Sequence, residues 1–308
     1  MDQSYKGFDP DFLPVKTKKM NRLDRVTTFD IINVLIQIGI ALVIIYPFYN
    51  TILVSLVPQV DYVRSPFMLL PKRITFESYE FVFGSNLLLR SMRTSVLMMI
   101  AGTIYNMTLT ILMAYAFTKP LPGKSFFRFL NIFTMYFGGG LVPYYLLINA
   151  IGLSNSFWVM VFPTVISVPY MLIVSNYFSS IPIELVESAS MDGATEMRIL
   201  MVIILPLSLP ILATFTLYYA VERWNEWYSA MLFIKDVNKW PLQMTLRKII
   251  QDANFISSDP MTGEVRPPTY GEGVKMASIV ITVFPLMAVY PLLQRYFLTG
   301  LTLGAVKG

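Results

Sequence analysis

Two glutamates four residues apart, Glu222 and Glu226, are the clearest candidates for chemistry in this 308-residue chain. Paired carboxylates act as acid and base in glycoside hydrolysis, and this spacing places their Cβ atoms roughly 5–6 Å apart on a helix. Nothing else supports an active site. The sequence contains no histidine and no cysteine, which excludes His-based triads, thiolate nucleophiles, disulfides and the usual zinc ligands. We therefore predict that the chain is not an enzyme and has no catalytic residue, metal site or cofactor of its own.

The residues around these glutamates are better suited to holding a sugar. Aromatic rings cover the apolar C–H faces of a sugar, while carboxylates and amides bind its hydroxyls. A charge at the centre of a bilayer costs about 2.5–3.5 kcal/mol, so Glu222 and Arg223 are expected to face a cavity or a partner. We predict a substrate pathway lined by Tyr144, Tyr219, Glu222, Trp224, Asn225 and Trp227. The alternative is an aromatic belt at the outer membrane interface, with charged side chains reaching toward water.

A second chemical motif, Gly123-Lys124-Ser125, is half of a phosphate-binding loop. The full motif needs a glycine five residues before Gly123, where this chain has Thr118. It also needs a preceding strand and a following helix, whereas these residues lie between two apolar runs. We interpret them as a polar turn and predict that this chain does not bind ATP itself.

Membrane helices are the elements that must position these residues. Hydrophobic residues make up 55% of the chain and charged residues 14%, against about 25% charged in soluble proteins. Six apolar runs approach or exceed the ~20 residues needed to cross a bilayer. They are residues 30–57, 94–117, 126–148, 157–178, 200–233 and 274–298. The expected fold is an all-α membrane protein with six transmembrane helices, in which Gly138–Gly140 should break or loosen the third.

The charges predict how these spans are oriented. The arm 1–29 is rich in lysine and arginine, and the first run is too long for a cleaved signal peptide. We therefore expect a cytoplasmic arm followed by a membrane domain over residues 30–308, with both termini in the cytoplasm. The net charge of +5 indicates membrane orientation rather than nucleic-acid binding. The long external loop 234–273 contains helical spacing over 242–250.

A polar segment, residues 179–200, separates the fourth and fifth runs and carries helix signals of its own. Ser180 is a candidate N-cap, Pro182 suits a first turn, and acidic residues follow where the helix dipole favours them. Leu185 and Ala189 then share one face, and Asp192-Gly193 predicts a turn. The sequence predicts a short amphipathic helix at the membrane surface, suited to docking into a groove on a partner.

The same segment resembles the EAA loop of the membrane subunits of ABC importers. The resemblance lies in Glu187-Ser188-Ala189, Asp192-Gly193-Ala194, Leu205-Pro206-Leu207 and Pro210, although Ser188 replaces the usual alanine and Leu200 a frequent phenylalanine. Outside this loop, four other segments are similar to the carbohydrate branch of the family. They are Phe137 to Pro143, Tyr219 to Val221 with Trp224, Asn225 and Trp227, Trp240 to Gln243, and Gly304 to Gly308.

The resemblance implies one half of a transport pathway in a bacterial plasma membrane. The implied partners are a homologous second permease subunit, two ATP-binding cassette subunits that bind ATP and Mg²⁺, an extracellular solute-binding protein and an oligosaccharide. The ATPase contact would fall on Glu184, Glu187, Ser188, Ala189, Asp192, Gly193 and Ala194. In related subunits the loop before the last span reaches the binding protein, which suggests the same for loop 234–273. Two alternatives are import of a non-sugar solute and a membrane scaffold without transport.

Overall fold

The computed structural model describes residues 28–65, 68–71, 73–84, 86–254, 257–258, 265–266 and 271–305. The basic arm before Thr28, most of the turn-rich segment from Asp259 to Pro268, and residues 306–308 lie outside this set. The chain forms two compact units that divide between Tyr49 and Asn50.

The helix α1 (Thr28–Ser55) crosses this division and is 28 residues long with Pro47 inside it. Every side chain from residue 28 to residue 49 is exposed. A helix of this length extends about 42 Å, which exceeds the ~30 Å hydrocarbon thickness of a bilayer. The first predicted span is therefore confirmed as a helix.

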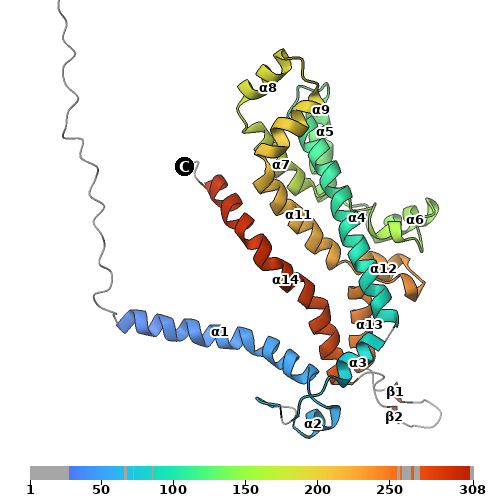
Figure 1. Cartoon of the computed structure of the whole chain (residues 1–308). Coiled ribbons are helices and arrows are strands. Elements are labelled where there is room, and N and C mark those ends of the chain that lie inside the picture. Colours follow the sequence, from blue (N-terminus) through green and yellow to red (C-terminus); the bar gives the residue numbers. More distant parts are fainter. Residues whose placement is uncertain are drawn as a thin grey trace, which may run out of the picture. The chain divides into compact units, whose positions relative to one another are not determined.

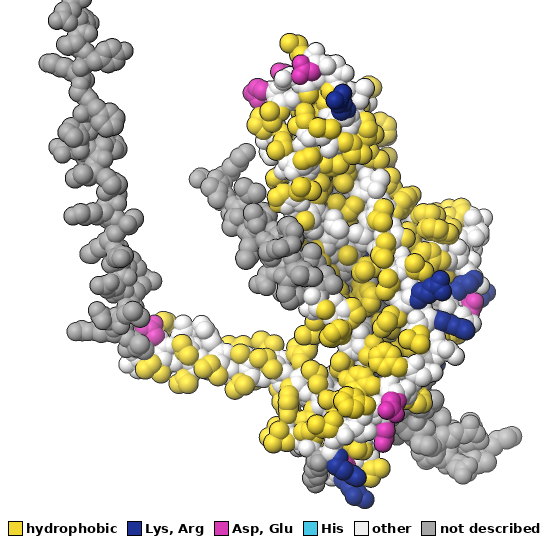
Figure 2. All heavy atoms as spheres, viewed as in Figure 1, with side chains coloured by type: hydrophobic (Ala, Val, Ile, Leu, Met, Phe, Trp, Pro, Cys, Tyr) yellow, Lys and Arg dark blue, Asp and Glu magenta, His cyan; other side chains and the backbone are white. Residues whose placement is uncertain are grey.

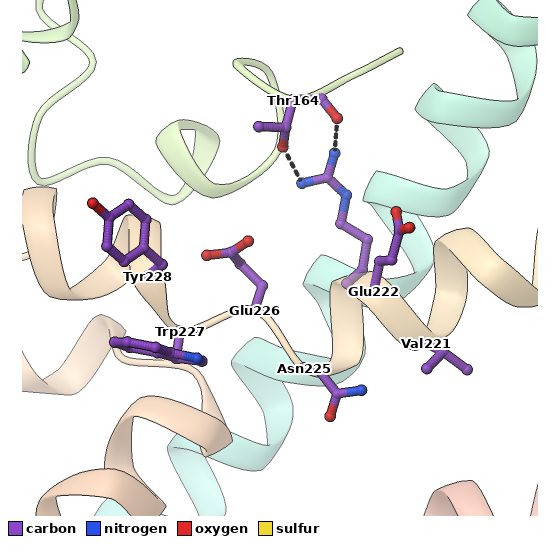
Figure 3. Close-up of a pocket in the computed structure, with 8 residues that line it drawn as sticks. Thr164, Val221, Glu222, Asn225, Glu226, Trp227 and Tyr228 are labelled. Atoms are coloured by element: carbon purple, nitrogen blue, oxygen red, sulfur yellow. Dashed lines mark hydrogen bonds between the residues drawn. The ribbon is translucent and has the colours of Figure 1, made fainter. Parts of the chain in front are cut away.

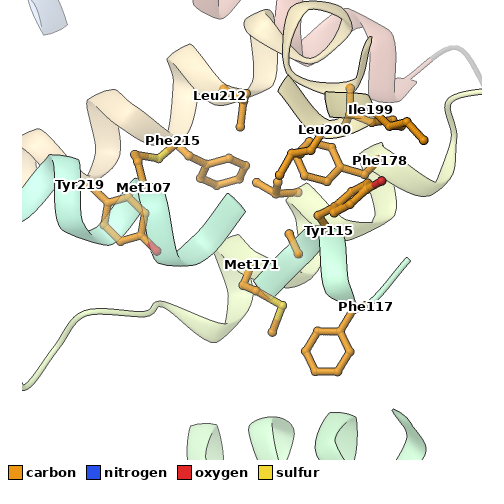
Figure 4. Packing of buried hydrophobic residues seen from close by; sticks show 13 residues of the cluster. Met107, Tyr115, Phe117, Met171, Phe178, Ile199, Leu200, Leu212, Phe215 and Tyr219 are labelled. Carbon is orange, nitrogen blue, oxygen red and sulfur yellow. The ribbon is translucent and has the colours of Figure 1, made fainter. Parts of the chain in front are cut away.

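The unit from residue 50 onward is organised around α4 (Asn86–Ala116). It packs against α11 (Leu209–Trp224) and α7 (Val168–Ser179), and α11 also packs against α14 (Glu272–Ala305) (Figure 1). The largest buried cluster lies between α4, α7 and α11 and includes Met107, Met171, Phe178, Leu212 and Phe215 (Figure 4). Burying such a side chain stabilises a water-soluble protein by about 1.5–3 kcal/mol. In a membrane, van der Waals packing between the helices stabilises the fold instead.

The remaining elements cover the ends and sides of this unit. Eight of them are helices between α4 and α13: α5 (Lys124–Tyr136), α6 (Leu141–Ala150), η1 (Phe157–Met160), α8 (Ile183–Met191), α9 (Glu196–Ile199), η2 (Leu200–Ile204), α10 (Leu205–Leu207) and α12 (Tyr228–Phe233). The others are α2 (Gln59–Arg64), α3 (Glu77–Gly84), η3 (Val237–Lys239), α13 (Leu242–Asn254) and the antiparallel pair β1 (Ser257–Ser258) and β2 (Val265–Arg266).

Within the described residues, two helices are long and apolar enough to cross a membrane by themselves, α1 and α4. A third crossing results if the segments Glu196–Leu207 and Leu209–Phe233 count as one span, although they meet at a bend of 86°. The bend falls at the buried Ser208, between Pro206 and Pro210. Proline lacks the amide hydrogen of the helical bond, which explains a break here.

The third and fourth runs are both divided. α5 ends at Tyr136 and α6 begins at Leu141, which confirms the break expected at Gly138–Gly140. The fourth run is not one helix, contrary to the prediction of a continuous span over 157–178. It consists of a single turn, η1, and a 12-residue helix, α7. Pro163 lies between them and Pro169 in the first turn of α7, and neither has an amide hydrogen to continue a helix from the preceding residues.

The external loop contains the helix that its spacing predicts. In α13, Leu242 and Ile249 are buried while Arg247 and Lys248 are exposed. Leu242 begins the helix by donating its amide to Ser95 Oγ of α4 at 2.7 Å. The loop is therefore anchored on the N-terminal third of α4.

Candidate functional site

The polar segment 179–200 forms a short helix at one end of the unit. Figure 1 places α8 and α9 at the end opposite α3 and the β1–β2 pair. The helix begins later than predicted: Ser180 ends α7, and Pro182 precedes the first residue of α8. The Ser180 hydroxyl donates to the carbonyl of Tyr177 at 2.7 Å, and Pro182 rather than Ser180 occupies the N-cap of α8, so the predicted cap is wrong.

The turn predicted at Asp192-Gly193 is confirmed and has a defined geometry. The Ala194 amide donates to the Ala189 carbonyl, and the Gly193 amide donates to the Ser190 carbonyl. Gly193 has φ of +80°, a backbone conformation that favours glycine. These two bonds and this angle make a Schellman motif, which ends α8 and fixes the direction in which the chain leaves it.

α8 has one face toward the protein and one face that is uncovered. Val186 and Ala189 are half-buried against the main core cluster, as is Ala194 after the turn. The side chains of Ile183, Glu184, Leu185, Glu187, Ser188, Met191 and Asp192 are exposed. Figure 2 shows acidic groups beside a basic one and apolar side chains at this end of the molecule. The exposed face thus offers both apolar and acidic contacts.

A polar brace connects the segment after α8 to the end of α4. Lys119 Nζ lies 2.7 Å from Glu196 Oε2, and the Tyr115 hydroxyl donates to the same oxygen at 2.6 Å. The hydrogen bonds from Lys119 and Tyr115 lower the pKa of Glu196. Burial lowers the pKa of Lys119, but the hydrogen bonds and charges of Glu196 and Tyr115 outweigh it and raise that pKa. The pair is therefore charged at neutral pH.

The brace predicts a pH dependence that Glu196→Gln should remove. Because the folded-state pKa of Glu196 is lowered, its stabilisation is present above the usual glutamate pKa and is lost as pH falls through the lowered value. The Glu196 side chain is 63% exposed, so we expect less than about 1 kcal/mol. Thermal unfolding between neutral pH and about pH 3 should show a smaller acid loss for Glu196→Gln than for the native chain. Glu184→Gln, an exposed glutamate of α8, is the control and should keep the native profile.

The second candidate site is a hollow of about 450 Å³ where α11 ends and α12 begins. Its lining consists of Thr164, Val221, Glu222, Arg223, Asn225, Glu226, Trp227 and Tyr228. Figure 3 shows the Glu226 carboxylate between the Trp227–Tyr228 pair on one side and the Glu222 carboxylate on the other. The helical backbone is interrupted at residues 225–227, between α11 and α12. The four consecutive residues 225–228 therefore all line the hollow.

Both carboxylates of the hollow are oriented by neighbouring groups. Glu222 Oε1 accepts from the Tyr170 hydroxyl at 2.6 Å, and Glu226 Oε1 accepts from the Ser229 amide at 2.8 Å. The Asn225 amide oxygen accepts from Gln243 of α13 at 3.1 Å. Each of these groups still has lone pairs or hydrogens with which to bind hydroxyls.

Arg223 forms the wall of the hollow and is only 4% exposed. Its guanidinium donates to the carbonyls of Met160, Val161 and Thr164, to Thr164 Oγ1 and to Asn106 Oδ1, at 2.7–3.3 Å. A Cβ on Gly102 of α4 would lie 2.8 Å from Arg223 Cδ, so this glycine makes room for the stem. Arg223 therefore holds the loop after η1 between α11 and α4.

The six predicted pathway residues do not lie together. Glu222, Asn225 and Trp227 line the hollow, whereas Tyr219 is 1% exposed and Trp224 2%. The Tyr219 hydroxyl is bonded to Thr110 Oγ1, and Trp224 Nε1 donates to the Thr282 carbonyl.

Tyr144 of α6, the sixth, is not among the residues that line the hollow, and its ring packs edge-on against Phe233.

The predicted pathway list omits five of the eight lining residues: Thr164, Val221, Arg223, Glu226 and Tyr228. Four of them lie in the segment 221–228 that the sequence singled out, so their positions could have been used. Thr164 is 58 residues before Glu222. It reaches the hollow because the loop between η1 and α7 is hydrogen-bonded to Arg223. No local signal marks it.

Comparison with known proteins gives the family. The model of the binding-protein-dependent transport system inner membrane component matches residues 26–302. The chain belongs to this family. The resemblance to ABC importer permeases drawn from the EAA-type segment is therefore confirmed, and the chain is a multi-pass membrane transport component.

Several known proteins are similar to this chain over almost their whole length. Protein LplC of Bacillus subtilis is 38% identical over 283 residues, which are 91% of this chain and 95% of the relative. The polygalacturonan/rhamnogalacturonan transport system permease protein YtcP of the same organism is 36% identical over 269 residues, 87% of this chain and 94% of the relative. A crystal structure of a bacterial ABC transporter that imports the acidic polysaccharide alginate matches with a TM-score of 0.79 and 30% identity, over 87% of this chain and 96% of the other.

Proposed function

We propose that this chain is the transmembrane subunit of an ATP-driven importer of oligosaccharides or polysaccharide fragments. Family membership supports a role in transport. The relatives support the sugar: YtcP is described for polygalacturonan and rhamnogalacturonan, and the AraQ permease of Halalkalibacterium halodurans, 26% identical, for arabinooligosaccharides. The Glu222–Tyr228 hollow supplies the carboxylates, amide and rings that a sugar requires.

The observation that carries the coupling role is α8, an exposed amphipathic helix with a fixed end. In the proposed arrangement α8 is cytoplasmic and docks into a groove on a separate ATPase, which binds ATP and Mg²⁺. Glu184, Glu187 and Ser188 are exposed for this contact, and Ala189 and Ala194 connect α8 to the core. Movement of the ATPases would pass through α8 and the bend at Ser208 to α11, because these segments follow one another in the chain.

The remaining parts of the proposal concern topology and partners. Six spans would place both termini in the cytoplasm, with the divided α5–α6, the divided η1–α7 and the bent η2–α11 segments each serving as one span. The exposed apolar side chains of α5 and α6 would face lipid or a homologous second permease subunit. A second ATPase copy and an extracellular solute-binding protein complete the assembly, and α13 with its loop would face the binding protein. The alginate importer has been crystallised in complex with a periplasmic protein, although that chain, at 12% identity and a TM-score of 0.56, is comparable in fold alone.

Single-cysteine labelling tests the orientation directly, because the chain contains no cysteine. In intact cells, Ser188→Cys on α8 should resist a membrane-impermeant maleimide, and Asn238→Cys beyond α12 should react. After the membrane is opened, both should react. The reverse pattern, with Ser188→Cys labelled from outside, would place α8 away from any cytoplasmic ATPase and disprove the coupling role.

Copurification separates an importer from a scaffold. A tagged copy isolated from native membranes should bring a nucleotide-hydrolysing subunit, and uptake of a labelled oligosaccharide should depend on this chain. Copurification with sugar uptake unaffected by deletion of the chain would favour another solute. The absence of any ATPase would favour the scaffold alternative.

A further inference from the structure

A second hollow adjoins the Glu222–Tyr228 hollow and shares Trp227 with it. Its volume is about 440 Å³, within the range of roughly 300–1,000 Å³ that ligand pockets have. We infer that this α13 hollow binds an acidic sugar and that Arg247 holds the sugar carboxylate. The inference rests on the proposed function, because it names the class of oligosaccharide. Apart from Trp227, the lining comes from α13: Gln243, Leu246, Arg247, Ile250 and Gln251.

The Arg247 guanidinium is positioned by a ring but keeps its hydrogen-bond donors. It lies 4.1 Å from the centroid of the Trp227 ring, which is a cation–π contact. The Arg247 side chain is exposed, and within the described part of the chain no oxygen accepts a hydrogen bond from it. A guanidinium has five N–H donors, and two of them in parallel match the two oxygens of a carboxylate. The tryptophan therefore holds in place a group that is free to bind an acidic sugar.

Two other cations near the hollows are already bonded to the protein. The terminal nitrogens of Arg223 make five hydrogen bonds to protein oxygens, and the residue is almost completely buried. Lys248 directly follows Arg247 in α13, but its Nζ lies 2.8 Å from Asp252 Oδ1, and it lines neither of the two hollows. Of these three cations, Arg247 is the one that offers unoccupied donors to a ligand.

The other polar groups of the two hollows suit the hydroxyls of the same oligosaccharide. The Gln243 amide nitrogen donates to Asn225 Oδ1 at 3.1 Å, which leaves the Gln243 amide oxygen to accept from a hydroxyl. In the adjoining hollow, the carboxylates of Glu222 and Glu226 also accept hydrogen bonds from hydroxyls. Glu222 is exposed to water, which weakens its repulsion of a sugar carboxylate. Because Trp227 lines both hollows, linked sugars can occupy the two together.

Uptake into cells that contain the complete importer tests the role of Arg247. The probes are trigalacturonate and its full methyl ester, which has the same rings without the negative charges, each at the same concentration. An exposed ion pair is weak, so we expect the ratio of acid uptake to ester uptake to fall about fivefold in Arg247→Gln. Arg247→Lys keeps the charge but not the paired donors, and its ratio should lie between these two. The binding protein is the same in every strain, so its own specificity cancels from the comparison.

The matched control is Lys248→Gln, which removes the neighbouring positive charge of α13 outside the hollow and should keep the native ratio. An equal fall in Lys248→Gln would assign the effect to the general charge of this surface and overturn the inference. An unchanged ratio in Arg247→Gln would overturn it as well. Uptake of neutral galactotriose without any uptake of trigalacturonate would also overturn it, while leaving oligosaccharide import in place. If none of the three probes enters, the proposed function itself fails, and the inference fails with it.

Discussion

Arg223→Met is expected to destabilise the folded subunit by at least about 3 kcal/mol. Methionine fills much of the volume of the arginine stem but has no hydrogen to donate. Three buried acceptors, the carbonyls of Met160 and Val161 and the Asn106 side chain, would lose a donor, together with the part-buried carbonyl and hydroxyl of Thr164. Each buried acceptor left unsatisfied costs about 1–3 kcal/mol, and lipid offers no water in compensation. The measurement is the temperature at which the purified subunit loses its monodisperse peak in size-exclusion chromatography.

Two further variants separate this bonding role from a general effect of losing an arginine. Arg93→Met makes the same chemical change at an exposed position of α4 and should leave the midpoint close to native. Arg223→Lys keeps the charge but has three donors on one nitrogen, which cannot reproduce the five bonds of a planar guanidinium, so we expect an intermediate loss. If Arg223→Met and Arg93→Met have the same midpoint, the guanidinium contributes no net stability.

The long-range bonds of Arg223 also show what the sequence cannot reveal. Its acceptors lie 59 to 117 residues away in the chain, on a loop and on a different helix. The sequence predicts that a charge at this position faces a cavity or a partner. The structure places its guanidinium in the wall of the hollow, where backbone carbonyls and two polar side chains accept its hydrogen bonds. Neither Gly102 nor Thr164 carries any local sign of this contact, because their role arises only when α4, α11 and the intervening loop pack.

Features that depend on neighbouring residues were predictable. The turn at Asp192-Gly193 and the break at Gly138–Gly140 follow from the conformational freedom of glycine and are both present. Ser180 shows the limit of such reasoning. Its side chain is typical of an N-cap, but α7 continues to Ser179, and the Ser180 hydroxyl donates to the Tyr177 carbonyl of that helix. A local pattern could not decide between two adjacent helix ends.

The same limit explains the pathway residues. The cluster from Glu222 to Tyr228 is contiguous in sequence, so its importance could be inferred, but the direction of each side chain could not. α11 ends at Trp224, and this last turn directs the indole toward Thr282 of α14. Trp227, the last residue of the break, lines the hollow instead. A break of three residues thus divides a single aromatic cluster between the core and the candidate site.

Gly193→Val is expected to uncouple ATP hydrolysis from uptake while leaving the packed helices intact. A Cβ at Gly193 would meet no atom within 4 Å, so the substitution causes no steric clash. The cost is conformational. A residue with a side chain pays about 1–2 kcal/mol in the left-handed region, and a β-branched one more. This shifts the local equilibrium roughly five- to thirty-fold away from the Schellman turn. The measurement is oligosaccharide uptake in cells, paired with the ATPase activity of the purified importer.

Gly193→Asn is the matched variant, because asparagine tolerates the left-handed conformation better than any β-branched residue. We expect uptake to fall at least about tenfold in Gly193→Val and to stay within about threefold of native in Gly193→Asn. Both variants should have native midpoints in size-exclusion chromatography, since α8 has no fully buried residue. Equal losses in the two variants would mean that the size of the residue, rather than the angle at the end of α8, determines the contact. Native uptake in Gly193→Val would show that the direction of the chain after α8 does not matter for coupling.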